Sequence, residues 1–273
     1  MIETTESVWP KVSCIVNTYD RADLLPRALQ SVYEQLDTFK DFEDIVVDDA
    51  STDDTGKVIE LWAGFFDEVG IPYRAFRLGE NSGYQAVPKN IGIEQAKGDY
   101  IRFLDDDNEW TKGSLKLLVD EIEKGDVWPD VVYGRREYVL DEGAPPDDKN
   151  GNPLFIGPSG LVKWDIDAKR RMAQSAMLNF IDTSDALISK GAFWWLVEHT
   201  QSMWNTSYRR FGDWELFCRA SHLDVLLGVV SWKFKEVDSI VQKYHWTGKN
   251  LQLTRPLHET PVAKSVTTGE TGR

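Results

Sequence analysis

The chain has 273 residues, which is enough for one large α/β domain or two small ones with a sizeable buried core. Its composition, 41% hydrophobic and 28% charged, is typical of a soluble globular protein. The formal net charge of −14 argues against a general nucleic-acid-binding or anionic-membrane-binding surface, because both need clustered positive charge.

Three features of the sequence bear on where the protein works. Cys14 and Cys218 are far apart and both have apolar neighbours, so we interpret them as reduced core residues. Residues Met1–Trp9 are acidic and lack the apolar region of a signal peptide. No segment approaches the roughly 20 consecutive apolar residues that a membrane span needs. These features predict a cytoplasmic protein that meets any membrane-bound partner peripherally.

The first half of the chain alternates between strand and helix patterns. Buried strands are expected at Val12–Val16, Ile45–Val47, Tyr73–Leu78, Asp99–Leu104 and Val131–Tyr133. Helices are expected on the apolar face running from Leu24 to Leu36, after Asp53, at Gln85–Lys97 and at Ser114–Lys124. This order predicts an α/β fold with a mostly parallel, Rossmann-like sheet and helices on both faces.

Polar residues follow three of these strands at the point where each ends. They are Asn17–Asp20, Asp48–Asp49 and Asp105–Asp107. Ligands of such sheets bind beyond the carboxyl ends of the strands, so these residues are expected to converge on one site. The three adjacent carboxylates at 105–107 repel one another and lose hydration, which indicates a cation there. Mg²⁺ or Mn²⁺ fits, because these ions prefer oxygen ligands and share them with phosphates.

Several ordered motifs resemble those of family 2 glycosyltransferases with the GT-A fold. The matching segments are Val12–Asp20, Ile45–Thr55, Asn81–Gly83, Lys89–Gly92 and Gly98–Ile101, followed by the acidic triplet. Later in the chain, Phe211–Phe217 resembles the acidic helix start that supplies the catalytic base in this family. The resemblance is strong over residues 11–110 and loose over residues 180–246.

The resemblance implies a role for each residue that lines the donor. Asp49 would accept a hydrogen bond from the pyrimidine ring N–H of the nucleotide. Asn17 and Tyr19 would line the base and ribose pocket. Asp106 would contact the ribose. Lys89 would lie near the diphosphate, where the family often has arginine; lysine keeps the charge but loses the bidentate geometry.

The resemblance also implies the metal and the base. Asp107 would bind the Mn²⁺ or Mg²⁺ that bridges the two phosphates, with Asp105 and His245 as further candidate ligands. Asp213 would be the general base. Many family members have Glu-Asp at this point, whereas this chain has Gly212 before the aspartate. Residues 1–110 would form the nucleotide-sugar-binding half and residues 111–246 the acceptor-binding half of one GT-A domain, with a flexible tail at 247–273.

The sequence therefore predicts an inverting, metal-dependent glycosyltransferase. It would move a sugar from a nucleotide diphosphate sugar, UDP-linked, to a hydroxyl of a glycan, a lipid-linked glycan, a protein or a small molecule. Two other functions stay open: a sugar nucleotidyltransferase, and an inactive family member that binds a nucleotide or glycan.

Several residues also have structural alternatives. The acidic triplet could be a helix-capping turn, Asp213 could be the N-cap of its helix, and Lys89 could be a solvated lysine on its helix.

Overall fold

The computed structural model describes residues 11–124, 129–140, 181–207, 212–213, 215–217, 219–220 and 232–246. Within these ranges eight strands form one sheet in the order β3-β2-β1-β4-β7-β6-β8-β5. The strands are β1 Val12–Thr18, β2 Phe42–Asp48, β3 Tyr73–Arg77, β4 Tyr100–Asp105, β5 Glu109–Trp110, β6 Val131–Leu140, β7 Ala186–Ser189 and β8 Phe234–Trp246. The helices are α1 Leu25–Tyr33, α2 Thr55–Glu68, α3 Ala86–Gln95, α4 Ser114–Glu123 and α6 Lys190–Thr200, with 3₁₀ turns η1 Glu34–Asp37 and η2 Thr183–Asp185.

The first half of the sheet is parallel, as the sequence predicts. Strand β1 pairs in parallel with both β2 and β4, and β2 pairs in parallel with β3. Each connection passes through a helix, as expected of parallel strands. The side chains of β1 and β2 are buried almost throughout, because helices cover both faces of these strands.

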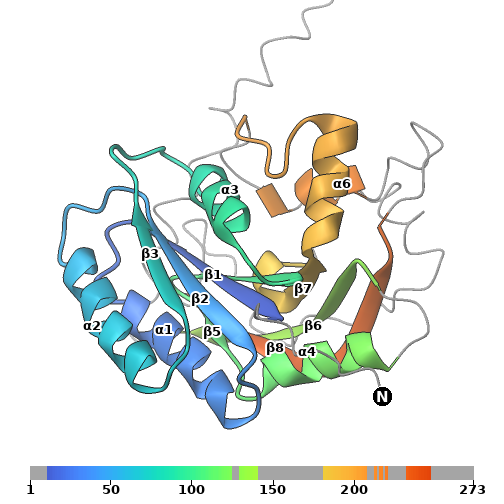
Figure 1. Cartoon of the computed structure of the whole chain (residues 1–273), viewed down its shortest axis with the longest axis horizontal. Coiled ribbons are helices and arrows are strands. Elements are labelled where there is room, and N and C mark those ends of the chain that lie inside the picture. The colour runs from blue at the N-terminus through green and yellow to red at the C-terminus, as the bar shows by residue number, and fades with distance from the viewer. Residues whose placement is uncertain are drawn as a thin grey trace, which may run out of the picture.

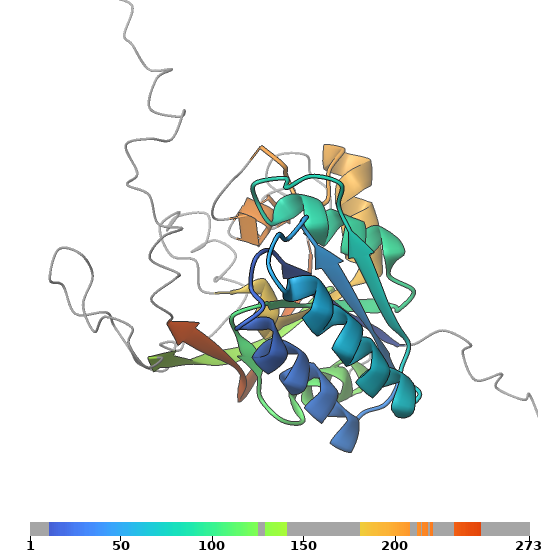
Figure 2. The same cartoon turned by 90° about the vertical axis from the view of Figure 1, so that its left-hand side faces the viewer.

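The second half of the sheet is mixed. Strand β7 lies between β4 and β6 and is antiparallel to both. The strand expected at Val131–Tyr133 is present as the start of β6, but it lies one strand farther from β4 because β7 intervenes. Strands β6 and β8 pair in parallel and run out from the body of the sheet (Figure 2). The two halves that we expect at residues 1–110 and 111–246 thus share one sheet.

Helices α3 and α6 cover one face of the sheet and α1, α2 and α4 the other (Figure 1), and a hydrophobic core lies on each face. On one face, Ile15, Ile101 and Phe103 pack against α3 and α6. On the other face, Val16 and Leu104 pack against α1, α2 and α4. Alternate residues of one strand point to opposite faces, so each central strand contributes to both cores. The helices expected from the apolar spacing therefore cover the sheet on both sides.

One glycine of the sequence motifs is required by close packing. A Cβ on Gly98, just before β4, would lie 2.6 Å from the backbone nitrogen of Ser13 in β1. The Gly98 N–H also donates to the Ser13 hydroxyl over 2.8 Å. Any side chain at position 98 would therefore push β4 away from β1.

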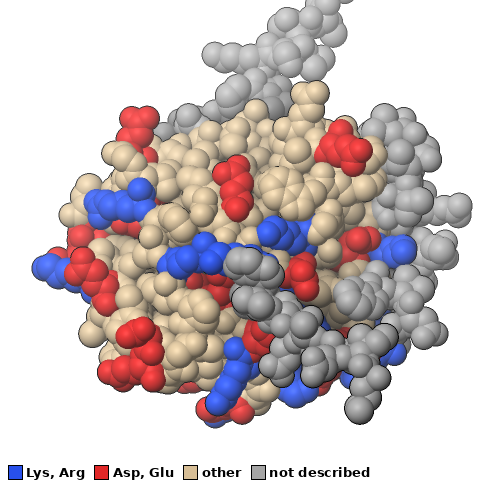
Figure 3. All heavy atoms as spheres, viewed as in Figure 1, with Lys and Arg blue, Asp and Glu red and all other residues tan. Residues whose placement is uncertain are grey.

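The structure also bears on the expectations about cysteines and location. Cys14 is buried and reduced, and burial raises the pKa of its thiol well above the usual range. Cys218, the loop at 141–153 and the tail at 247–273 lie outside the described residues. In the described part of the chain, no helix has both the length and the apolar character needed to cross a bilayer. Basic groups stand among acidic and uncharged ones on the face seen in Figure 3.

A buried carboxyl in β2 makes the stability depend on pH. Asp44 has no solvent exposure, and among the described residues no side chain donates a hydrogen bond to its carboxylate. Burial raises the pKa of Asp44 to about 8. In the unfolded chain an aspartate ionises near its ordinary value of about 4. Between these two values the folded state binds more protons than the unfolded state, so the stability falls as the pH rises.

We therefore predict that Asp44→Asn makes the fall of stability between pH 5 and pH 8 less steep and makes the protein more stable than the wild type at pH 8. Urea unfolding at pH 5 and pH 8 measures the effect, with the exposed Asp67→Asn as a control that keeps the wild-type slope. An Asp44→Asn variant whose stability falls with pH as steeply as that of the wild type would contradict the assignment.

Candidate functional site

The polar strand ends meet at one edge of the sheet, as predicted from the topology. Asn17, near the end of β1, lies opposite Asp105 of β4, and Thr18 lies opposite Asp48 of β2. The turn η2 joins this edge, because the hydroxyl of Ser184 accepts a hydrogen bond from the backbone N–H of Asp105 over 3.3 Å. Residues from four separate parts of the chain therefore surround one rim.

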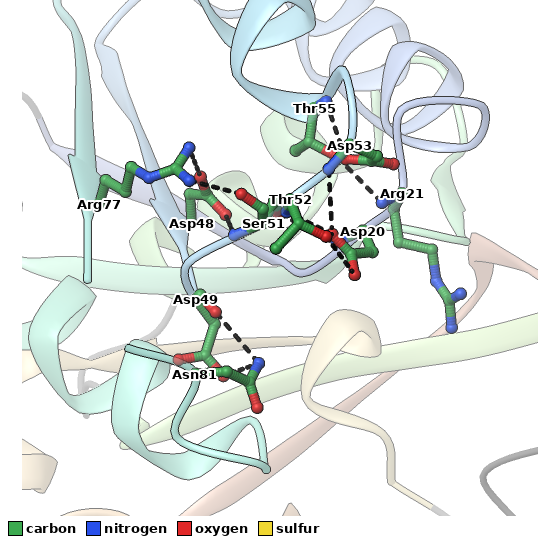
Figure 4. A network of polar contacts seen from close by, with 10 residues as sticks. All are labelled: Asp20, Arg21, Asp48, Asp49, Ser51, Thr52, Asp53, Thr55, Arg77 and Asn81. Carbon is green, nitrogen blue, oxygen red and sulfur yellow. Dashed lines mark hydrogen bonds and ion pairs between the residues drawn. The ribbon is translucent and has the colours of Figure 1, made fainter. Parts of the chain in front are cut away.

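The loops after β1 and β2 are fastened to each other (Figure 4). The carboxylate of Asp20 accepts hydrogen bonds from the backbone N–H groups of Thr52 (2.6 Å) and Asp53 (3.3 Å). In return, the hydroxyl of Ser51 accepts from the Asp20 N–H over 3.0 Å. Asp20 has a φ of +48°, which aspartate tolerates better than most residues. The two loops act as one unit, so residues carried by either loop keep a fixed relative position.

Asp48 and Asp49 are adjacent in sequence but have different environments. Asp48 is buried, its carboxylate pairs with Arg77 of β3 over 3.0 Å, and it accepts the backbone N–H of Ser51. These contacts hold the turn together. The following Ala50 has a φ of +64°, so the chain bends sharply directly after Asp49. Asp48 therefore holds the turn, whereas the Asp49 carboxylate, which is also buried, contacts the segment Asn81–Gly83.

The segment Asn81–Gly83 orients the Asp49 carboxylate. One oxygen accepts the backbone N–H of Ser82 over 2.9 Å, and the other accepts the Ser82 hydroxyl (2.8 Å) and the Asn81 amide (3.2 Å). Each carboxylate oxygen has two lone-pair positions, so the oxygen that accepts only one hydrogen bond keeps capacity for another donor. The motif at 81–83 therefore fixes the orientation of the Asp49 carboxylate.

Asn17 and Tyr19 lie beside this acid at the end of β1. The Tyr19 side chain is 41% exposed, and its pKa is raised mainly by Asp20 and further by the charge of Asp49. The side-chain oxygen of Asn17 is buried and accepts no hydrogen bond from the described residues. An exposed ring, an oriented carboxylate and an unused acceptor suit a planar ligand that has N–H and O–H groups.

The acids at 105–107 have different neighbours. Asp105 shares a sheet face with Phe103 and pairs with Lys89 of α3 over 3.1 Å. Asp106 faces Arg21, whose Nε lies 3.9 Å from the carboxylate. Burial raises the pKa of Asp105 despite the lysine, and it raises the pKa of Asp106 to about 6.

Asp107 is the least compensated acid of the triplet. Burial raises the pKa of its carboxyl well above the usual range, and the charges of Asp106 and Asp105 raise it further. Among the described residues, no cation forms an ion pair with this carboxylate. Arg27 of α1 donates to the backbone carbonyl of Asp107 over 2.7 Å. A divalent cation beside Asp107 would therefore relieve the repulsion.

The donor set fits a metal that is shared with a ligand. In the described ranges, no group of three or more His, Cys, Asp or Glu side chains forms a complete protein cage for an ion. Mg²⁺ and chemically similar ions need no such cage, because they commonly bind to one or two carboxylates and take their other ligands from phosphates and water. The crowded carboxylate of Asp107 meets that requirement.

His245 lies next to the acidic turn but points at another acid. Its backbone N–H donates to Asn108 over 2.9 Å, and its Nε2 lies 2.8 Å from the carboxylate of Glu109. His245 therefore lies near the triplet, as expected. A metal bond through Nε2 would require the contact with Glu109 to open.

The sequence indicates that Lys89 is either near the diphosphate or solvated on its helix. In the structure its environment differs from both. It is 1% exposed, so the interpretation as a solvated lysine is wrong. Its ammonium lies between Asp105 and the indole ring of Trp204, 4.6 Å from the ring centroid, and donates to the Thr183 hydroxyl over 3.3 Å. Lys89 thus compensates the first acid of the triplet from inside the protein. A direct contact with a diphosphate would require this ion pair to break.

Asp213 lies within a helix that packs against Trp204. Residues 212 and 213 are both helical, so Asp213 is not the N-cap that its position before Trp214 indicates. A Cβ on Gly212 would lie 3.0 Å from the indole of Trp204, the ring that also contacts Lys89. Asp105, Lys89, Trp204 and Gly212 thus form one series of contacts that links the acidic turn to the helix of Asp213.

The sequence interpretation missed several charged residues around the triplet. Asp182 precedes η2 and is buried, and its charge raises the pKa of both Asp105 and Asp107. Arg136 of β6 pairs with Asp185 over 2.7 Å and lies 3.6 Å from Asp182. Asp182 and Asp185 form the capping box of η2. Its place beside β4 depends on β7, which is too short to predict from periodicity.

The sheet and the acidic turn define a GT-A fold, and solved structures share this architecture. The crystal structure of Staphylococcus aureus TarS 1-349 in complex with UDP-GlcNAc has a TM-score of 0.58 at 18% identity, and the match covers 90% of this chain and 62% of that chain. The mannosyltransferase PcManGT from Pyrobaculum calidifontis, in complex with GDP-Man and Mn²⁺, has a TM-score of 0.53 at 19% identity and covers 87% of this chain and 57% of that chain. At these identities the likeness shows the fold alone.

The chain belongs to glycosyl transferase family 2, whose family model matches residues 13–217. The GalNAc(5)-diNAcBac-PP-undecaprenol beta-1,3-glucosyltransferase of Campylobacter jejuni is 39% identical over 119 residues, which cover 42% of this chain and 36% of that protein. The poly(ribitol-phosphate) beta-N-acetylglucosaminyltransferase TarS of Staphylococcus aureus is 33% identical over 138 residues, 50% of this chain and 22% of that protein. The chain thus spans less than half the length of these two relatives.

Proposed function

We propose that the protein is an inverting, metal-dependent glycosyltransferase that moves a sugar from a UDP-linked donor to an acceptor hydroxyl. The observation that carries this proposal is the Asp107 carboxylate, which has no ion pair among the described residues, at the same rim as the oriented carboxylate of Asp49. The first of these suits a cation that carries phosphates, and the second suits a pyrimidine base. Membership of glycosyl transferase family 2 supports the same reaction class.

In this proposal the nucleotide binds across the ends of β1, β2 and β4. Asp49 accepts the ring N–H of uracil with its remaining lone pair. The exposed Tyr19 ring and the unused oxygen of Asn17 line the base and ribose pocket. Asp106 accepts a ribose hydroxyl. Lys89 compensates Asp105 from beneath and so leaves the two following acids to face the donor.

Asp107 would hold the metal, with Asp105 behind it and His245 close to the same turn. A bound Mn²⁺ or Mg²⁺ supplies positive charge that stabilises the departing diphosphate. Arg21 and Arg27 hold the turn from the α1 side, Arg21 through Asp106 and Arg27 through the Asp107 carbonyl. The protein therefore contributes a rigid carboxylate rather than a flexible one.

Asp213 would act as the general base. Its carboxylate takes the proton of the acceptor hydroxyl while the hydroxyl oxygen attacks the anomeric carbon. The bond from that carbon to the diphosphate oxygen breaks, and its electron pair leaves with UDP. Because the attack comes from the side opposite the leaving group, the configuration at the anomeric carbon inverts. An α-linked donor thus gives a β-linked product.

We propose residues 1–110 as the donor half and residues 111–246 as the acceptor half of one domain, in a cytoplasmic enzyme that meets membrane acceptors peripherally. The relatives support a glycan or lipid-linked glycan acceptor, since the Campylobacter protein is named for an undecaprenol-linked glycan and TarS for poly(ribitol-phosphate). A protein or small-molecule hydroxyl is the remaining class. The UDP-GlcNAc complex of TarS supports a UDP-linked donor.

The proposal predicts that UDP raises the thermal unfolding midpoint strongly with Mn²⁺ and weakly without it, because a ligand that binds only the folded state stabilises it. Asp107→Asn should abolish the Mn²⁺-dependent part of the shift. Asp99→Asn is the matched control, because this exposed acid precedes β4 at its opposite end. If UDP with Mn²⁺ leaves the wild-type midpoint unchanged, the proposed donor class is wrong.

The assignment of the base predicts a separation of binding from turnover. Asp213→Asn should bind UDP and Mn²⁺ like the wild type but release UDP from a UDP-sugar about 100-fold or more slowly, in the range typical of a lost general base. Isothermal titration calorimetry measures the binding, and a coupled assay for UDP measures the turnover. Wild-type turnover in the Asp213→Asn variant would remove Asp213 as the base.

A further inference from the structure

We infer that Trp204 is a positioning residue that fixes Asp213 relative to the acidic turn. This inference rests on the proposed function, in which Asp213 must lie at a set distance from the donor held by Asp107. Trp204 is 1% exposed, and its indole ring contacts both Lys89 and Gly212.

Trp204 is fastened to α3. The Asn90 amide donates to the Trp204 carbonyl over 3.1 Å, and the Trp204 N–H donates back to the Asn90 side-chain oxygen over 2.9 Å. The Lys89 ammonium lies 4.6 Å from the ring centroid of Trp204, within the range of a cation–π contact. Two consecutive residues of α3 therefore set the position of both the backbone and the ring.

The same lysine reaches the acidic turn. Its ammonium lies 3.1 Å from Asp105 and 3.3 Å from the Thr183 hydroxyl. Lys89 is 1% exposed, so its charge has little access to water and loses much if these partners move. The Lys89 side chain thus contacts both Trp204 and Asp105, the first acid of the triplet.

The indole ring of Trp204 also contacts the helix of the base. A Cβ on Gly212 would lie 3.0 Å from Cζ3 and 3.2 Å from Cε3 of the indole, which is tighter than ordinary van der Waals contact. The helix backbone therefore rests directly on the ring, one residue before Asp213. This contact explains why glycine stands where the family resemblance leads one to expect glutamate.

The same helix is tied to the segment that carries Trp204. Arg219 pairs with Glu215 on its own helix and donates to the Thr200 hydroxyl (2.7 Å) and to the carbonyls of Ser202 (2.8 Å) and Met203 (2.5 Å). The ring and the helix consequently move together. A change of shape at the contact between Trp204 and Gly212 displaces Asp213.

Donor binding does not depend on this contact. The Asp49 carboxylate is oriented by Asn81 and Ser82, and the acidic turn is also held by Arg21 and Arg27. A disturbance between Trp204 and Gly212 should therefore reduce the rate of the chemical step and leave the affinity for UDP unchanged. A general loss of structure would reduce both.

One methyl group tests the contact. Gly212→Ala should lower kcat for UDP release about 10-fold or more, since misplacement of a reacting group by 1 Å can cost 100-fold. The affinity for UDP with Mn²⁺ should stay at the wild-type value. Gly64→Ala is the matched control, because a Cβ on Gly64 of α2 meets nothing within 4 Å. The substrates are UDP-glucose and UDP-N-acetylglucosamine with water as the acceptor, and calorimetry with UDP and Mn²⁺ gives the affinity.

A compensating substitution sharpens the test. Trp204→Phe removes ring atoms that touch Gly212, so it should also slow UDP release, and it serves alone if Gly212→Ala does not fold. The double variant Trp204→Phe/Gly212→Ala should recover part of the rate lost in Gly212→Ala, because the smaller ring makes room for the methyl group.

Three results would overturn the inference while leaving the proposed function in place. They are an unchanged rate in Gly212→Ala, an equal fall in rate and UDP affinity, and a double variant that is slower than both single variants. A wild-type protein that binds no UDP would instead refute the proposed function, and the inference with it.

Discussion

Electrostatic repulsion within the acidic turn after β4 is the constraint on which the rest of the site depends. Burial raises the pKa of Asp105, Asp106 and Asp107. The charge of Asp105 raises the pKa of the other two further, and the charge of Asp182 raises that of Asp105 and Asp107. The protein compensates the three acids unequally: Lys89 pairs with Asp105, Arg21 faces Asp106 at a longer distance, and Asp107 is left without an ion pair among the described residues. Because the positive charge near the three acids is unequal, we expect a bound cation to lie beside Asp107 rather than beside Asp105 or Asp106.

The surrounding elements hold that turn in place without neutralising all of its charge. The loops after β1 and β2 are fastened to each other through Asp20, and Arg27 of α1 holds the carbonyl of Asp107. On the other face of the sheet, Lys89 contacts Trp204, and Trp204 contacts Gly212 in the helix of Asp213. Rigidity on both sides suits a reaction in which the base and the leaving group must stay at a fixed separation.

Much of the fold and the rim of the site could be predicted from the sequence. The apolar strands ending in Asn17, Asp48 and Asp105 determine a parallel sheet, and parallel strands must bring their carboxyl ends to one edge. Other features could not be predicted. Four residues, 186–189, are too few for periodicity to reveal β7, and without β7 neither Asp182 nor Arg136 can be placed beside the triplet. The burial of Lys89 depends on Trp204, which lies 115 residues later in the chain.

The central claim is that Asp107 holds a divalent cation which carries the diphosphate of a UDP-linked donor. A crystal grown with UDP and Mn²⁺ tests it most directly, because the anomalous scattering of manganese locates the ion independently of the protein chain. We expect one anomalous peak in contact with the Asp107 carboxylate and with the diphosphate, and a hydrogen bond from the uracil N–H to Asp49. Ordered UDP at the rim with no manganese at Asp107, or manganese and UDP bound at another edge of the sheet, would contradict it.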